Sequence, residues 1–282
     1  MIRFPPKKIL VAYDLSDASR MAWRHAAALA ADCGADLEVI YVEPWLVGGD
    51  LMPPPGLTAE GVRALRAEIR DNVGEGAKIT ILHGDPARCI LNAARQHRPD
   101  LIVVGTRARK GLELALLGST AEAVIRSAAV PVLAARGKVG TVRSILAPVN
   151  FTAYSEHGFR YAAAASAVLG ARLKVLHVTD DPIWSGNVRH RLSILIERLP
   201  DVVRRSSRPF SEAVVGDAVN GMLTACKGQD WIVLVSHRKS LIKDAFFGTT
   251  LEQVLHRSSI PVLSVPAPRA GAFKEPVGAG RG

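Results

Sequence analysis

The segment from Val104 to Thr120, VGTRARKGLELALLGST, combines residue types that could hold a phosphate group. Gly105 follows an apolar run, and a glycine there permits a positive φ angle and close approach of a ligand to the backbone. Gly118, Ser119 and Thr120 are typical of a helix start, where unpaired backbone N–H groups and hydroxyls favour an anion. Mobile positive charge is supplied nearby by Arg107, Arg109 and Lys110.

The same residues have a plain structural explanation, in which Gly105 turns the chain, Ser119 caps a helix and the basic side chains are solvated. Asp14 favours binding, because a carboxylate directly after the first apolar run would face the crevice at the strand ends. There it could accept a hydrogen bond from a ribose hydroxyl or an adenine amine. Asp14 could also be the N-cap of a helix that begins near Ser16, and the two roles are compatible.

The elements that must position these residues follow from the alternation of short apolar runs with helical stretches. Apolar strands separated by helices are typical of a parallel sheet covered on both faces, so we predict a doubly wound, Rossmann-like α/β fold. Its ligand crevice should lie at the carboxyl ends of the first and fourth strands. We expect strands over 8–13, 37–42, 78–83, 101–104 and 131–135, and helices over 16–33, 59–70, 86–96 and 119–127.

The second half of the chain repeats the first. SILAPVNFT at 144–152 matches KILVAYDLS at 8–16, and the stretch 246–265 matches 116–135. Such self-similarity is typical of a duplication, so we predict two tandem five-stranded parallel sheets. The first domain should span residues 1–138 and the second 139–267. Residues 268–282 are rich in Gly, Pro and Ala, and we predict that they form a disordered tail.

The second copy has lost parts of the candidate site. Asn150 replaces Asp14, and Ser236 replaces Gly105. Gly248 corresponds to Gly118, but it follows Ser236 by twelve positions, whereas Gly118 follows Gly105 by thirteen. We therefore predict a degenerate second site that has lost the binding function of the first and could retain an anion.

Composition excludes several classes of protein. No apolar run reaches about 18 residues, the length of a membrane span. The N-terminus meets PPKK at 5–8 before an apolar stretch, unlike a signal peptide, so we expect a cytoplasmic protein without membrane contact. The three cysteines, Cys33, Cys89 and Cys226, form no CxxC pair or disulfide framework, and we predict buried thiols.

The histidines and the known catalytic motifs give no sign of a metal centre or a nucleophile. Eight histidines include no HExxH pair, and GxSxG and GxxxxGK[ST] are absent. We therefore predict no metal site and no catalytic residue. His83 and His177 should be structural imidazoles at strand ends, and His25 a partly exposed helix residue.

The net charge of +10 raises the question of an anionic partner. Residues 1–140 hold 18 Lys and Arg against 15 Asp and Glu, a net +3, whereas residues 141–282 hold 18 against 11, a net +7. Nucleic-acid binding is a weaker alternative, because the chain has no recognition helix, RNP-like aromatics or clustered basic helix.

These motifs resemble the universal stress protein family. Its nucleotide-binding members carry an Asp after the first strand and a loop written G-x2-G-x9-G-[ST] after the fourth. Here the loop positions are Gly105, Ala108, Gly118 and Ser119, with the spacing intact and alanine in place of the second glycine. The resemblance extends to the Gly-Asp-Pro at 84–86 and the Pro-Val-Leu at 131–133, in a chain with two copies of the pattern.

The resemblance implies a fold like that of the adenine nucleotide alpha hydrolases and a ligand that is ATP or AMP, with any Mg²⁺ carried by the nucleotide. Asp14 and the backbone around Val42 would hold adenine. The stretch from Gly105 through Thr106 and Arg107 to Ala108 would lie beside the ribose and phosphates. Gly118, Ser119 and Thr120 would bind the phosphates.

The resemblance further implies a nucleotide-responsive stress protein without catalysis. The two halves would form an intramolecular pseudo-dimer through 131–135 and 261–265, two chains would pair as a homodimer, and an unidentified protein would be the partner. The alternative is a slow ATPase or a nucleotide-dependent transferase of similar fold. Such an enzyme would require a divalent metal during turnover, for which Asp14 and Asp17 are the candidate ligands.

Overall fold

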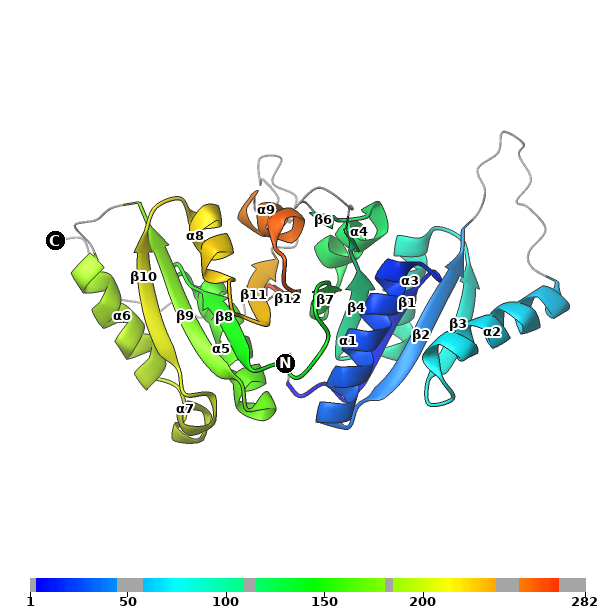
Figure 1. Ribbon diagram of the computed structural model, residues 1–282, viewed down its shortest axis with the longest axis horizontal. Coiled ribbons are helices and arrows are strands. Elements are labelled where there is room, and N and C mark those ends of the chain that lie inside the picture. Colours follow the sequence, from blue (N-terminus) through cyan, green and yellow to red (C-terminus); the bar gives the residue numbers. More distant parts are fainter. Residues whose placement is uncertain (1–3, 45–57, 109–114, 181–184, 237–248, 269–282) are drawn as a thin grey trace.

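The computed structural model describes residues 4–44, 58–108, 115–180, 185–236 and 249–268 of the 282-residue chain. Within them, helices alternate with strands along the chain, and the long strands gather in one sheet (Figure 1). All but the first residue of the predicted C-terminal tail lie outside the described residues. No helix within the described ranges has the length and apolar character needed to cross a membrane.

The predicted α/β alternation of the first half is confirmed, with most boundaries within one or two residues of the expected ones. An additional short antiparallel pair, β5 with β6, flanks residues 109–114. The elements are β1 (Lys8–Tyr13), α1 (Asp17–Cys33), β2 (Asp36–Glu43), α2 (Ala59–Val73), β3 (Lys78–His83), α3 (Pro86–His97), β4 (Leu101–Gly105), β5 (Arg107–Ala108), β6 (Ala115–Leu116), α4 (Ser119–Ser127) and β7 (Val132–Ala135).

The second half repeats this order, with two helices where the first half has α2. Its elements are β8 (Ser144–Pro148), α5 (Ala153–Leu169), β9 (Arg172–Thr179), α6 (Ser185–Glu197), α7 (Asp201–Ser207), β10 (Phe210–Val215), α8 (Ala218–Ala225), β11 (Trp231–Ser236), α9 (Thr249–Arg257) and β12 (Val262–Pro266). The duplication in the sequence is therefore a duplication of structure.

The two parallel sheets are joined edge to edge into a sheet of ten strands. Its order is β10-β9-β8-β11-β12-β7-β4-β1-β2-β3, so both halves have the order 3-2-1-4-5 from the outer edge inward. The fifth strands of the halves, β7 and β12, pair antiparallel, with Leu133 opposite Leu263. The predicted contact between the last strands of the two copies is thus confirmed.

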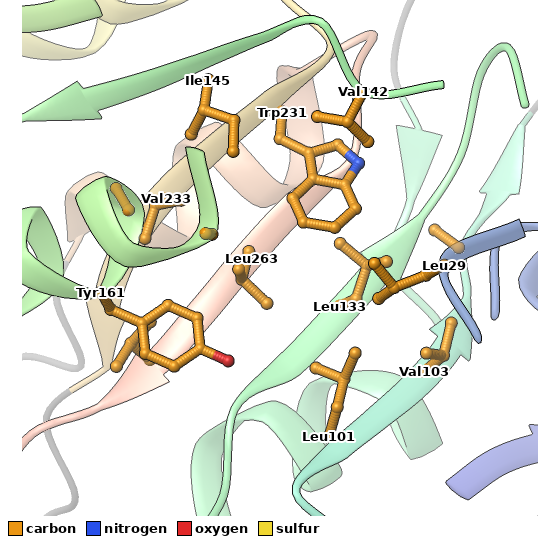
Figure 2. Packing of buried hydrophobic residues seen from close by; sticks show 14 of the residues in the cluster. Leu29, Leu101, Val103, Leu133, Val142, Ile145, Tyr161, Trp231, Val233 and Leu263 are labelled. Atoms are coloured by element: carbon orange, nitrogen blue, oxygen red, sulfur yellow. The ribbon is translucent and has the colours of Figure 1, made fainter. Parts of the chain in front are cut away.

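Helices cover both faces of the sheet, which explains why its central strands are apolar without alternation. In β1, Ile9 and Val11 face the layer of α1, α2, α5, α6 and α7, whereas Leu10 faces α3, α4, α8 and α9. Each core layer runs through both halves. Around the β7–β12 joint, Leu133, Leu263 and Trp231 belong to one buried cluster (Figure 2).

The local sequence explains where the helix next to the candidate site begins and ends. Ser16 is the N-cap of α1, and its hydroxyl accepts from the backbone N–H of Ser19 at 3.2 Å. The alanine-rich stretch after it favours a helix. Gly34 ends it in the left-handed region, with φ 64°.

Two predictions about single side chains are wrong. His25 is buried rather than partly exposed, because α1 packs against the joint of the halves and its Nε2 lies 3.0 Å from the main-chain oxygen of Arg136. Of the three cysteines predicted to be buried, only Cys226 is, whereas Cys33 and Cys89 are half-buried. Cys33 ends α1 and Cys89 lies in the first turn of α3, positions that the helical pattern does not place in the core.

Candidate functional site

The carboxyl ends of β1, β2 and β4 and the first turns of α1, α3 and α4 enclose a cavity of about 380 Å³. This is where a doubly wound sheet leaves a crevice, because the crossovers from β1 and β4 run to opposite faces. The volume is within the range of small-molecule sites. Six of the nine predicted site residues line it, namely Asp14, Val42, Gly105, Gly118, Ser119 and Thr120.

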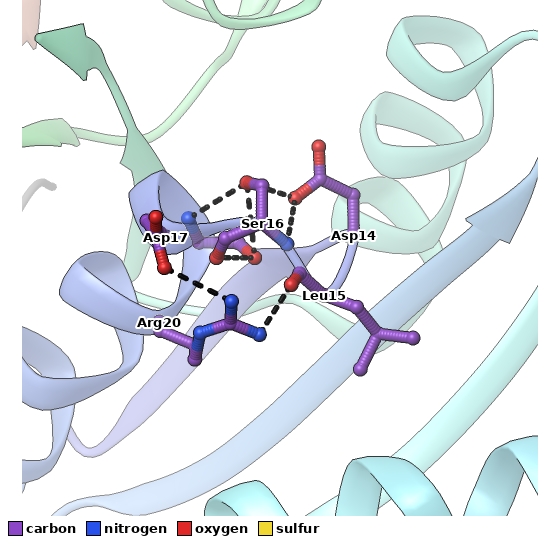
Figure 3. Close-up of polar contacts among 6 residues, drawn as sticks. Asp14, Leu15, Ser16, Asp17 and Arg20 are labelled. Atoms are coloured by element: carbon purple, nitrogen blue, oxygen red, sulfur yellow. Dashed lines mark hydrogen bonds and ion pairs between the residues drawn. The ribbon is translucent and has the colours of Figure 1, made fainter.

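Asp14 is exposed at the end of β1 and is held by the turn into α1 (Figure 3). Its Oδ1 accepts from the backbone N–H of Ser16 at 3.1 Å and from the Ser16 hydroxyl. An Asp that binds the backbone two residues ahead in this way forms an Asx-turn. Ser16, not Asp14, is the N-cap of α1, so the alternative role predicted for Asp14 belongs to its neighbour.

The turn that carries Asp14 is fixed by a second set of contacts. Leu15 has φ 61°, a left-handed conformation that is uncommon outside glycine. The guanidinium of Arg20, one turn into α1, donates to the main-chain oxygen of Leu15 and to Asp17 Oδ1, the latter at 2.9 Å (Figure 3). The Asp14 carboxylate therefore projects from a braced loop.

Helix α4 presents its N-terminus to the cavity. Gly118 is its N-cap with φ −67° and ψ 150°, and no side chain makes a capping hydrogen bond there. The first backbone N–H groups of a helix have no partner within the helix and carry the positive end of its dipole. A Cβ built on Gly118 would meet nothing within 4 Å. This end of the cavity has room and hydrogen-bond donors for an anion.

Gly105 is a glycine for a reason that the sequence does not reveal. We expected a positive φ or an approach to the ligand, but its φ is not in the left-handed region. A Cβ there would instead overlap the main-chain carbonyl of Ala18 and lie 2.9 Å from the Ser19 nitrogen. The absent side chain lets the first turn of α1 pack directly on the end of β4.

Of the three other predicted residues, only Thr106 has a described side chain, and it is not among the described lining residues of the cavity. Thr106 is buried, and both its backbone N–H and its hydroxyl donate to the main-chain oxygen of Ala135, at 3.2 and 3.1 Å. It therefore extends the β4–β7 contact. Arg107 and Ala108 form β5, and their side chains, like residues 109–114, lie outside what the structure describes.

Sequence reasoning missed several residues that line the cavity. Burial raises the pKa of Tyr41 to about 12, so this phenol stays protonated and donates to Glu43 Oε2 at 3.2 Å. Pro86 and Ile90 contribute from the first turns of α3, which begins after the N-cap Asp85. The Gly-Asp-Pro sequence was the available signal, since it marks a helix that starts at the carboxyl end of β3.

The second half has a corresponding but smaller cavity of about 260 Å³. It lies at the carboxyl ends of β8, β9 and β11 and is lined by Asn150, Thr152 and Thr250, among others. Tyr154 lines it in the place that Ala18 takes in the first half. Gly248, which corresponds to Gly118 of the first copy, lies outside the described residues.

Comparison with known proteins agrees with this architecture. The model of the universal stress protein family matches residues 5–136 and again residues 212–266. The chain belongs to the universal stress protein family. The first match contains every position that lines the larger cavity, whereas the second begins after Asn150 and covers the later part of the second copy.

Other universal stress proteins resemble single copies or the whole tandem. The chain is 39% identical over 142 residues to universal stress protein MJ0531 of Methanocaldococcus jannaschii, a match that covers 45% of this chain and 80% of that protein. It is 36% identical over 140 residues to a Thermus aquaticus universal stress protein, covering 46% and 98%. A universal stress protein of Archaeoglobus fulgidus has a similar fold, with a TM-score of 0.73 and 20% identity over 93% of this chain and 99% of its own.

Proposed function

We propose that the first half of this universal stress protein binds an adenine nucleotide, ATP or AMP, and that the protein responds to the nucleotide without chemically changing it. The observation that carries the proposal is the cavity itself. It unites a braced carboxylate after β1 with the uncapped N-terminus of α4, although about a hundred residues separate Asp14 from Gly118.

The end of the cavity near β1 and β2 suits adenine and ribose. Asp14 offers carboxylate oxygens, which accept from a base amine or a sugar hydroxyl. The β1–β2 ladder ends with Tyr13 opposite Tyr41, while β2 continues to Glu43. On the side facing β1, the backbone of Val42 therefore lies beyond the last residue pair of this ladder. This position supports its proposed contact with the base.

The other end of the cavity suits phosphates. The N-terminus of α4, with Gly118, Ser119 and Thr120 around it, combines backbone donors with a favourable dipole. A magnesium ion would arrive with the nucleotide. Asp14 is the one acidic residue among the described lining residues, which include no histidine or cysteine. This lining supports binding rather than hydrolysis, because its described residues include no second acidic or histidine side chain that could act as a general base.

The arrangement of the halves supports an internal pseudo-dimer of domains at 1–138 and 139–267, joined by the β7–β12 pair. We further propose a cytoplasmic homodimer that presents its surface to a protein partner when nucleotide is bound.

Native mass spectrometry of the gently desalted full chain tests the proposal, followed by calorimetry with ATP, AMP and GTP. We expect co-purified adenine nucleotide and one adenine-nucleotide site per chain. Two equal sites would contradict the predicted degeneracy of the second copy. Steady release of ADP that requires magnesium would contradict a function in binding alone and would favour the alternative, a slow ATPase.

A further inference from the structure

The cavity of the second half is chemically different from its counterpart. The cavity has a volume of about 260 Å³. Apolar side chains from three elements line it: Val178 of β9, Met222 of α8 and Leu251 of α9. None of the described residues that line it carries a charge. The described lining therefore offers a ligand apolar contact and neutral hydrogen-bonding groups, without the carboxylate of the first cavity.

Asn150 occupies the position of Asp14 and makes the same turn. Its Oδ1 accepts from the backbone N–H of Thr152 at 3.3 Å and from the Thr152 hydroxyl at 2.7 Å. A backbone N–H can only donate, so the turn fixes which end of the amide is oxygen. Phe151 has φ 58°, close to the 61° of Leu15, so the two turns share their backbone conformation as well.

This shared turn inverts the hydrogen-bonding character of the site. In the first half, the side chain beyond the turn is a carboxylate, which can only accept. In the second half, the atom beyond the turn is Nδ2 of Asn150, which carries two donor hydrogens. Among the described residues, Nδ2 has no hydrogen-bond partner. The first cavity therefore selects a donor on its ligand, and the second selects an acceptor.

We propose that the second cavity binds a heterocycle through a ring carbonyl, as in a 6-oxopurine nucleoside, and discriminates against the 6-amino counterpart. An amine opposite Asn150 would place donor against donor, whereas a carbonyl oxygen accepts from Nδ2. Val178, Met222 and Leu251 provide the apolar surface that a ring needs. The choice of a purine rests on the nucleotide proposed for the first cavity, but the choice of a carbonyl rests on Asn150 alone.

Inosine and adenosine are suitable probes, because they differ in having oxygen or an amine at one ring position. The chain contains four methionines, of which Met222 lines the second cavity. Met21, on α1, is not among the described lining residues of either cavity and serves as an internal control. Labelling the full chain with ¹³C-methyl methionine gives one methyl signal for each methionine, and the signal of Met222, which a Met222→Leu variant assigns, reports on this cavity.

We expect the Met222 methyl resonance to shift saturably with inosine, at a Kd at least tenfold lower than with adenosine. Asn150→Asp should lower the affinity for inosine at least tenfold and remove the preference, because it restores the acceptor of the first half. Asn72→Asp on the exposed surface of α2 controls for the added charge. Asp14→Asn should leave the Met222 titration unchanged.

An unmoved Met222 resonance, equal affinity for the two nucleosides, or an inosine preference that survives Asn150→Asp would each overturn the proposal. If Asn150→Asp does not fold, Asn150→Ala, which removes the donor without adding charge, should also abolish the preference, and its persistence would be equally decisive. Failure of nucleotide binding in the first cavity leaves the Met222 signal unaffected, so the two proposals fail separately.

Discussion

The guanidinium of Arg136, in the first half, donates through Nη1 to the main-chain oxygen of Ser258, in the second half, at 2.9 Å. Ser258 follows the last residue of α9, so the cation meets the negative end of that helix dipole. The main-chain oxygen of Arg136 in turn lies 3.0 Å from Nε2 of His25. One buried residue thus links α1 of the first half to α9 of the second.

Substitution of Arg136 should show how much this link contributes to stability. The residue is only 6% exposed, and its Nε and Nη2 have no hydrogen-bond partner among the described residues. Arg136→Ala should lower the free energy of unfolding by about 2 kcal/mol or more, through a lost charge-assisted hydrogen bond and lost packing. Arg136→Met should cost less, because it keeps apolar packing and removes an incompletely paired buried charge. Urea denaturation measures both, and a Met variant less stable than the Ala variant would contradict this reasoning.

His25 should make the stability depend on pH in the mildly acid range. Burial lowers the pKa of His25 below its ordinary value, although its bond to the Arg136 oxygen opposes the shift. The unfolded chain, with a histidine pKa of about 6.5, therefore takes up a proton at a higher pH than the folded chain. The contribution of His25 should be complete above about pH 6.5 and decline as the pH falls from there through the folded pKa.

His25→Gln tests this, because an amide can donate to the Arg136 oxygen but does not titrate. The variant should lose less stability than the wild type when denaturation is compared at pH 7.5 and pH 5. His157, whose pKa burial also lowers, remains in both proteins and provides a common background. Equal losses in the two proteins would show that His25 is not responsible.

The same substitution, glycine to alanine, should lower stability much more at Gly105 than at Gly118. Gly105→Ala places a Cβ into the backbone of Ala18, so α1 or β4 must shift, and we expect a loss of about 2 kcal/mol or more. Gly118→Ala adds the same atom in open space at a φ that alanine adopts readily, so its cost should be limited to the preference of an N-cap for glycine over alanine, about 1 kcal/mol or less. Thermal denaturation compares them directly, and similar melting temperatures would refute the packing role of Gly105.

Gly118→Val should abolish nucleotide binding with the fold retained. A branched side chain at the N-cap of α4 fills the space where phosphate would approach the backbone donors. Calorimetry with ATP, with far-UV circular dichroism as the check on folding, measures the effect. A folded variant that still binds ATP with wild-type affinity would place the phosphates elsewhere.

Asp14→Asn should weaken adenine-nucleotide binding about ten- to a hundredfold, since a charge-assisted hydrogen bond contributes about 1.5–3 kcal/mol. Stability should change little, because Asn150 already holds the equivalent turn in the second half. Titration of the full-length variant with ATP and a parallel melting curve separate the two effects. Lower stability with unchanged affinity would leave Asp14 with a purely structural role.

The amino-acid sequence by itself determined the class of fold, the duplication and the place of the candidate site. Strand and helix periodicities are local, so β1, β3 and α4 begin and end where the pattern predicts. Right-handed crossovers leave few possible strand orders, and each of them places a crevice at the carboxyl ends of strands where the winding reverses, which is why the sequence assigns Asp14 and Gly118 to one crevice.

Only the tertiary structure decided what surrounds each of these residues. Gly105 meets the backbone of Ala18, and His25 and Arg136 are buried at the joint of the halves, because helix α1 and the β7–β12 pair approach from distant parts of the chain. Likewise, Asn150 looks like a lost carboxylate in the sequence. The turn fixes its oxygen on Thr152 and leaves the amide nitrogen as the other end of a side chain that lines the second cavity. Contacts between elements depend on how the elements pack, and no local pattern records them.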